Sequence, residues 1–153
     1  MRSKLVLLLS FLAVIDPAAF AQDAPDRSAD ESAIRHVTQE YILRRDRGDE
    51  TGLRALLTAN ADQRLTSGRM RLGREAIVSG SLESTRNSGG TRVITLNSIR
   101  FLGADVAIGN GDYDSLGRAD GTDLHMLTTI VFWRIDGEWR IDAIRNARSP
   151  DQL

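Results

Sequence analysis

Residues 123–147 read DLHMLTTIVFWRIDGEWRIDAIRNA, which is two strand-like segments around one short turn. The segments, Asp123–Ile135 and Trp139–Ala147, are rich in Val, Ile, Thr and aromatic residues, which favour β-strands. Asp136-Gly137 between them tolerates the positive φ angles of a type I′ turn. These residues therefore predict a β-hairpin.

Two segments upstream, Thr91–Leu102 and Asp105–Leu116, have the same strand-forming composition. Gly103-Ala104 separates them, and residues 117–122 separate the second segment from the hairpin. Connections this short place consecutive strands side by side in antiparallel orientation. The sequence thus predicts a four-stranded antiparallel meander in this part of the chain.

The region before the meander has helical periodicity. Ser28-Ala29-Asp30-Glu31 predicts a capping box, and Ile34, Val37 and Tyr41 lie on one apolar stripe of a helix that ends near Arg47. Shorter patterns then follow one another: a helix carrying Leu53, Leu56 and Leu57, a strand over Asp62–Ser67, a turn at Gly68-Arg69, a strand over Met70–Leu72, and a helix over Arg74–Leu82 with Ile77, Val78 and Leu82 inward. Helices first and strands last predict an α+β domain whose helices cover one face of a curved, mainly antiparallel sheet.

The strand expected within Leu124–Ile135 is apolar on both of its alternating faces. A sheet with one solvated face should alternate apolar and polar residues. We therefore expect one face to pack against the helices and the other against a second subunit, which predicts a homodimer.

Composition excludes several classes of protein. The chain has 153 residues, no Cys, two His, and 20 basic against 21 acidic groups. Disulfides and thiolate sites are excluded, the charge balance gives no pull toward nucleic acid, and neither a phosphate-binding loop nor a dinucleotide fingerprint occurs. We expect no cofactor and no metal. One domain is expected over residues 29–148, followed by a tail at 149–153.

The first residues are typical of a secretory signal peptide over residues 1–21. Arg2 and Lys4 precede the mostly apolar run at 5–15, and Ala19-Phe20-Ala21 has the small-residue pattern of a cleavage site. A helix of this run spans about 16 Å, half of the roughly 30 Å bilayer core, so no permanent membrane anchor is expected. We expect cleavage at Ala21-Gln22, a flexible lead-in at 22–28, and a periplasmic or secreted protein.

The order of these elements resembles the nuclear transport factor 2-like superfamily, which includes the SnoaL-like polyketide cyclases and the ketosteroid isomerases, and in particular its uncharacterised secreted branch. The segments Leu57–Asp62, Gly68–Ile77 and Gly137–Asn146 are similar to that superfamily's sequences. The resemblance implies a cone-shaped α+β barrel with a pocket between the helices and the concave face of the sheet. It also implies proton transfer by a pocket Asp or His, with donors that stabilise an oxyanion.

Three residues are candidates for that chemistry. Asp62 or His125 would be the base, and Tyr41 would donate to an oxyanion. Each has a structural alternative. Tyr41 can be a core residue bonded to the backbone, Asp62 can form an ion pair that lowers its pKa beside Arg64, and His125 can lie outside the pocket.

The expected ligand pocket combines polar and aromatic groups, namely Tyr41, Arg64, Asp112, Trp133 and Arg145. Counting by two along the last strand puts Arg145 on the same face as Trp139. An inward Arg145 would either hold a ligand carboxylate or pair internally with Asp62 or Asp112.

Three functions remain open on these observations. The first is an exported domain that binds a small apolar or carboxylate-bearing molecule. The second is a cofactor-independent isomerase, cyclase or dehydratase that uses Asp62 or His125. The third is a dimeric interaction module whose cone is filled by Met70, Trp133 and Trp139.

Overall fold

A computed structural model describes residues 26–150 of the protein. Three helices and six strands make up this part of the chain, in the order α1 (Ser28–Arg47), α2 (Glu50–Ala55), β1 (Leu57–Arg64), β2 (Met70–Leu72), α3 (Arg74–Ser88), β3 (Thr91–Phe101), β4 (Val106–Leu116), β5 (Leu124–Ile135) and β6 (Glu138–Arg148). The expected signal peptide and its cleavage site lie outside the described residues. No helix within 26–150 is long and apolar enough to cross a membrane.

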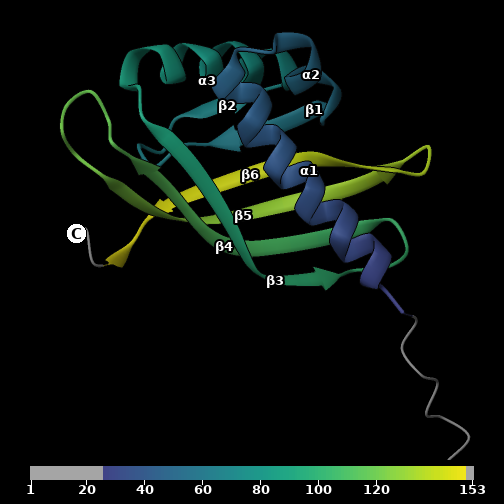
Figure 1. The fold of residues 1–153 in the computed structure, drawn as a ribbon. Helices are drawn as coiled ribbons and strands as arrows, with labels where there is room; N and C mark the ends of the chain where they lie inside the picture. The colour runs from purple at the N-terminus through teal and green to yellow at the C-terminus, as the bar shows by residue number, and fades with distance from the viewer. Residues whose placement is uncertain (1–25, 151–153) are drawn as a thin grey trace, which may run out of the picture.

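The six strands form one curved sheet in the order β2-β1-β6-β5-β4-β3. All neighbours are antiparallel except β1 and β6, which run parallel. The sheet is open, with β2 and β3 as its edges. Figure 1 shows α1 lying diagonally across the concave face, with α2 and α3 over the β1–β2 end. The α+β fold with helices on one face of a curved, mainly antiparallel sheet is therefore confirmed.

Helix α1 has the predicted apolar stripe but a different N-terminus. Ile34 and Tyr41 are almost fully buried against the sheet. The predicted capping box is wrong, because Arg27 is the N-cap and has no side-chain cap, so Ser28 already lies within the helix. The Ser28 backbone N–H instead donates to Asp26 Oδ1, outside the helix, at 2.9 Å.

The boundaries of α2, β1 and α3 differ from those expected. Leu57 is fully buried but begins β1 instead of continuing α2, because its backbone pairs with β6. The strand predicted over Asp62–Ser67 therefore begins five residues earlier and ends at Arg64. Helix α3 continues past Leu82 to Ser88. Its last turns carry polar residues, so they lack the apolar repeat on which the predicted end depended.

The predicted hairpin between β5 and β6 is confirmed. Asp136 and Gly137 have φ angles of 53° and 81°, as a type I′ turn requires. The concave face of β5 and β6 supplies the centre of the core, where Ile130, Phe132 and Ile141 are completely buried beneath the helices.

A bulge in β6 changes which residues face the helices. The pairing with β5 shifts between Val131 and Phe132, whose partners are Ala143 and Ile141, so Asp142 is an extra residue. Ile141 and Ile144 are both buried on the concave face, although they are three positions apart. The side chain of Arg145 consequently lies on the convex face, and the inward position expected from counting by two is wrong.

Candidate functional site

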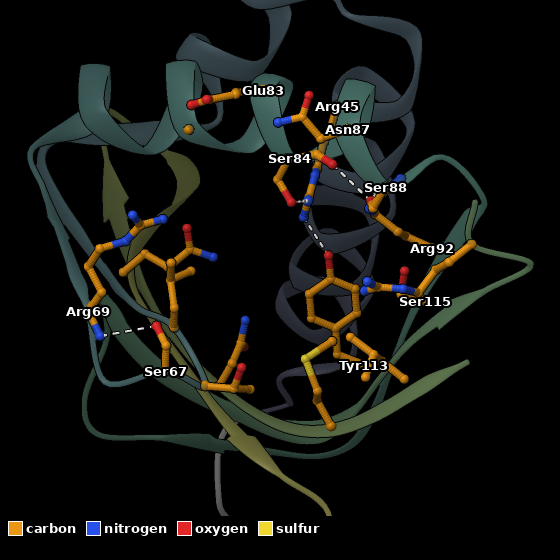
Figure 2. A pocket seen from close by; sticks show the side chains of 18 of the residues that line it. Arg45, Ser67, Arg69, Glu83, Ser84, Asn87, Ser88, Arg92, Tyr113 and Ser115 are labelled. Atoms are coloured by element: carbon orange, nitrogen blue, oxygen red, sulfur yellow. Dashed lines mark hydrogen bonds between the residues drawn. The ribbon is translucent and has the colours of Figure 1, made fainter. Parts of the chain in front are cut away.

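A cavity of 520 Å³ lies between the polar side of α3 and the concave face of the sheet. Its lining comes from α1, the β1–β2 hairpin, α3 and strands β3 to β6. Figure 2 shows α3 forming one wall and Tyr113 rising from the sheet opposite it. Met70 and Trp133 are 39% and 49% exposed, so the cone is not filled by these side chains as the interaction-module hypothesis required.

Arg71 projects from β2 into this cavity and is held by neutral groups. Its Nη1 donates to Gln63 Oε1 at 2.8 Å and to Ser81 Oγ at 3.4 Å, and its Nη2 donates to the Gly80 carbonyl at 2.7 Å. A Cβ at residue 80 would collide with the guanidinium, so the glycine in α3 makes room for it. Burial lowers the pKa of Arg71, which reflects the cost of keeping this charge away from water.

Arg45 reaches the same cavity from α1 and is 5% exposed. It donates to Thr85 Oγ1 at 2.9 Å, to Ser84 Oγ at 3.4 Å and to the hydroxyl of Tyr113. Figure 2 shows Arg45 descending beside α3 to meet the Tyr113 hydroxyl. The Tyr113 ring is buried, and this burial raises the pKa of its phenol.

The other buried cation of the lining is neutralised. Arg92 is 3% exposed and forms an ion pair with Asp46 at 3.0 Å. At the mouth, Arg118 is paired with Asp120 at 2.8 Å. Arg45 and Arg71, by contrast, form no ion pair with any described residue. A buried charge without a counterion costs several kcal/mol, so these two arginines create a strong local preference for an anion.

Asp62 does not face the cavity. Its Oδ1 lies 2.5 Å from Arg145 Nη1, and both side chains are partly exposed on the convex face. Gln63 takes the inward position in β1, and the alternation of a strand then turns Asp62 and Arg64 outward. The expected pocket positions of Asp62, Arg64 and Arg145 are therefore corrected, and Arg145, not Arg64, pairs with Asp62.

Tyr41 lies behind the cavity wall. It is 1% exposed, and its hydroxyl is 3.3 Å from Ser81 Oγ, the hydroxyl to which Arg71 also donates. Tyr41 is thus a core residue that contacts the site only through Ser81. It is not among the residues that line the cavity.

The remaining candidates lie on the convex face of β4 and β5. His125 Nδ1 is 2.8 Å from Asp114 Oδ1, Asp112 accepts from Asn97 at 2.8 Å, and Trp133 is half exposed. Their inward neighbours, including Tyr113 and Met126, line the cavity instead. Asp62 forms an ion pair and His125 is exposed, and neither residue lines the cavity. The proton-transfer hypothesis therefore loses both of the bases that the sequence suggested.

Sequence reasoning missed both central arginines. Arg45 had a usable signal, because it follows Tyr41 by four residues and so continues the buried stripe of α1. Arg71 had none, since a three-residue strand has no periodicity to assign a face. No cluster of three or more metal-ligating side chains occurs within residues 26–150.

Comparison with known proteins identifies the fold and no activity. Neither a scan of family models nor a search of curated proteins finds a match. Solved structures do match. An NTF2-like protein of unknown function from Shewanella oneidensis has a TM-score of 0.66, 16% identity, and coverage of 77% of this chain and 98% of its own. A hexachlorocyclohexane dehydrochlorinase has a TM-score of 0.68, 19% identity, and coverage of 80% and 87%.

A third similar structure is a dehydratase-type protein of the NTF2-like family from Streptomyces avermitilis, with a TM-score of 0.68 at 15% identity. It covers 81% of this chain and 99% of its own. The described chain therefore has the nuclear transport factor 2-like fold. Because this fold is shared by proteins of unrelated activities, the function must be argued from the cavity itself.

Proposed function

We propose that this protein is an exported single-domain receptor that binds a small carboxylate-bearing molecule in the arginine-lined cavity. The observation that carries the proposal is the pair Arg45 and Arg71, which point into one cavity without a carboxylate partner among residues 26–150. A carboxylate between them would supply the missing counterion. The polar lining favours such a ligand over the apolar one that the sequence also allowed.

The cavity holds these two guanidinium groups in place before a ligand arrives. Arg45 has three neutral partners and Arg71 has three, so little side-chain freedom remains to be lost on binding. Charge-assisted hydrogen bonds are about twice as strong as neutral ones, and partial burial protects them from screening by salt. The volume of 520 Å³ is within the usual range of roughly 300–1,000 Å³ for small-molecule sites.

Titration calorimetry with benzoate and its neutral counterpart benzamide tests this function. We expect benzoate to bind the wild-type protein about tenfold or more tightly than benzamide. Arg71→Gln should remove this preference, because it deletes the charge and keeps polar atoms near Gln63 and Gly80.

Arg64→Gln is the matched control, since Arg64 is an exposed arginine of the same hairpin outside the cavity. Equal affinity for benzoate and benzamide in the wild-type protein would contradict the proposal. So would an unchanged preference in Arg71→Gln that circular dichroism shows to be folded.

A homodimer through the convex face is the second part of the proposal. Leu127 and Trp133 are 44% and 49% exposed on that face, and they flank Val131 on the same strand. Light scattering should give twice the monomer mass for the wild-type protein and the monomer mass for Trp133→Glu. Amino-terminal sequencing of protein from its own host tests export, and a terminus at Gln22 is the expected result.

A further inference from the structure

The charges of the cavity specify more about the ligand than a single carboxylate. The ligand class inferred below rests on the proposed function, because the same site binds it. Five arginines line the cavity, and two of them are already neutralised, Arg92 by Asp46 and Arg118 by Asp120. The remaining three are Arg45, Arg69 and Arg71. Glu83 on α3 is the one lining carboxylate without an ion pair among the described residues.

Counted over residues 26–150, three cations and one carboxylate of the lining have no ion pair, which leaves an excess of two positive charges in the cavity. Burial is the main cause of the lowered pKa of Arg71, and repulsion by Arg45 and by Arg69 lowers it further, so each of these two arginines is close enough to interact with Arg71. A ligand with a single negative charge would neutralise only half of this excess. A ligand with two negative charges would neutralise it completely.

The three free arginines differ in burial, and this difference indicates where each anionic group would bind. Arg45 is almost fully buried, Arg71 is partly buried, and Arg69 is exposed on the turn between β1 and β2. Figure 2 shows Arg69 on the hairpin wall, across the cavity from Arg45 and Tyr113. Arg45 and Arg71 are thus the inner cations, and Arg69 is an outer cation on the hairpin wall, opposite Arg45.

The Tyr113 hydroxyl gives a second, independent reason to expect an anion at the inner end of the cavity, beside Arg45. Its hydroxyl oxygen accepts from Arg45, and its own proton has no acceptor among residues 26–150. The side chain lines the cavity and is only 5% exposed. A buried donor without an acceptor costs about 1–3 kcal/mol. An oxygen of a ligand anion held by Arg45 would accept this proton.

We infer that the ligand carries two separate anionic groups, one bound at the inner end by Arg45, Arg71 and the Tyr113 hydroxyl, and the other bound at the mouth by Arg69. The recognised class is therefore a dicarboxylate or a comparable molecule with an anionic group at each end. Arg69 is the residue that distinguishes such a molecule from one with a single carboxylate.

Calorimetry with terephthalate and its monomethyl ester tests this inference, since the two probes share one skeleton and differ by one charge. At a pH that ionises every carboxylate, terephthalate should bind the wild-type protein about tenfold more tightly than the ester. Arg69→Gln should reduce the affinity for terephthalate to that of the ester and leave the affinity for the ester unchanged. Arg64→Gln, on the other side of the same hairpin, should change neither affinity.

Phenyl phosphate, which carries both charges on one group, separates the two-group ligand from a phosphoryl ligand. The inference is contradicted if Arg69→Gln leaves the preference for terephthalate intact, or if phenyl phosphate exceeds terephthalate in affinity. Equal binding of terephthalate and the ester also overturns it, while the proposed carboxylate receptor stands. If none of the three probes binds the folded wild-type protein at about 10 mM, both the inference and the proposed function fail.

Discussion

Replacing Gly80 by Ala should separate the stability of this protein from its ability to bind anions. Gly80 lies in the middle of α3, and a Cβ at this position would collide with the Arg71 guanidinium. The guanidinium must therefore move, which breaks its hydrogen bonds to the Gly80 carbonyl at 2.7 Å and to Gln63 at 2.8 Å.

The expected change in stability is small because opposing effects cancel. Alanine in a helix interior is favoured over glycine by about 1 kcal/mol. The two broken hydrogen bonds cost a similar amount, since water in the open cavity replaces most of what is lost. We expect the free energy of unfolding in urea to stay within about 1 kcal/mol of the wild-type value.

The expected change in binding is large. A displaced Arg71 no longer donates to the ligand, and a hydrogen bond to a charged group contributes about 1.5–3 kcal/mol. This corresponds to a loss of benzoate affinity of about 10-fold to 100-fold, measured by calorimetry. Ser79→Ala is the matched control, because Ser79 is the exposed neighbour in the same helix and is not part of the cavity.

A double-mutant cycle shows whether Arg71 carries the effect. Gly80→Ala should weaken binding little further once Arg71→Gln is present, since the group it displaces is already gone. The reasoning is refuted if Gly80→Ala binds benzoate as the wild-type protein does. An additive loss in the double variant would refute it as well.

Three further outcomes follow from the structure. Phe132→Ala should lower the free energy of unfolding by about 3–5 kcal/mol in urea titrations, because Phe132 is completely buried, and a loss below about 1 kcal/mol would contradict its place in the core. Asp62→Asn should leave benzoate affinity unchanged, since its partner Arg145 is on the convex face, and a tenfold loss would return Asp62 to the site. The Arg27 hydrogen bond lowers the pKa of Asp30, so its contribution to stability is present above about pH 4 and lost as the pH falls further. In Asp30→Asn, the melting temperature should therefore fall less steeply than in the wild-type protein as the pH is lowered below about 4. An equally steep fall in both proteins would argue against this contribution.

Local patterns in the sequence were sufficient to predict which helices and strands form and the order in which they occur. The apolar repeat of Ile34, Val37 and Tyr41 predicted α1, and Asp136-Gly137 predicted the turn between β5 and β6. Both depend on neighbouring residues alone. The capping box failed because a side-chain cap competes with other local contacts, and here Asp26 already accepts from the Ser28 N–H.

The site was harder to predict because its residues come from eight of the nine elements. The expected pocket residue Arg145 was displaced by one extra residue, Asp142, which reverses the face of everything after it in β6. Arg71 gave no local signal, and its role depends on Gly80 in a different element. A bulge and a contact between distant residues both arise from pairing and packing, which the identity of neighbouring residues does not encode.

By itself, the sequence determined that helices precede a long-stranded sheet, because backbone periodicity and turn chemistry act over a few residues. Only the tertiary structure decided which charges share a cavity. Arg45 and Arg71 come from a helix and a short strand, and their lack of a carboxylate partner is apparent only once every described neighbour is placed. Electrostatic free energy depends on distance and burial in space, and neither quantity follows from position along the chain.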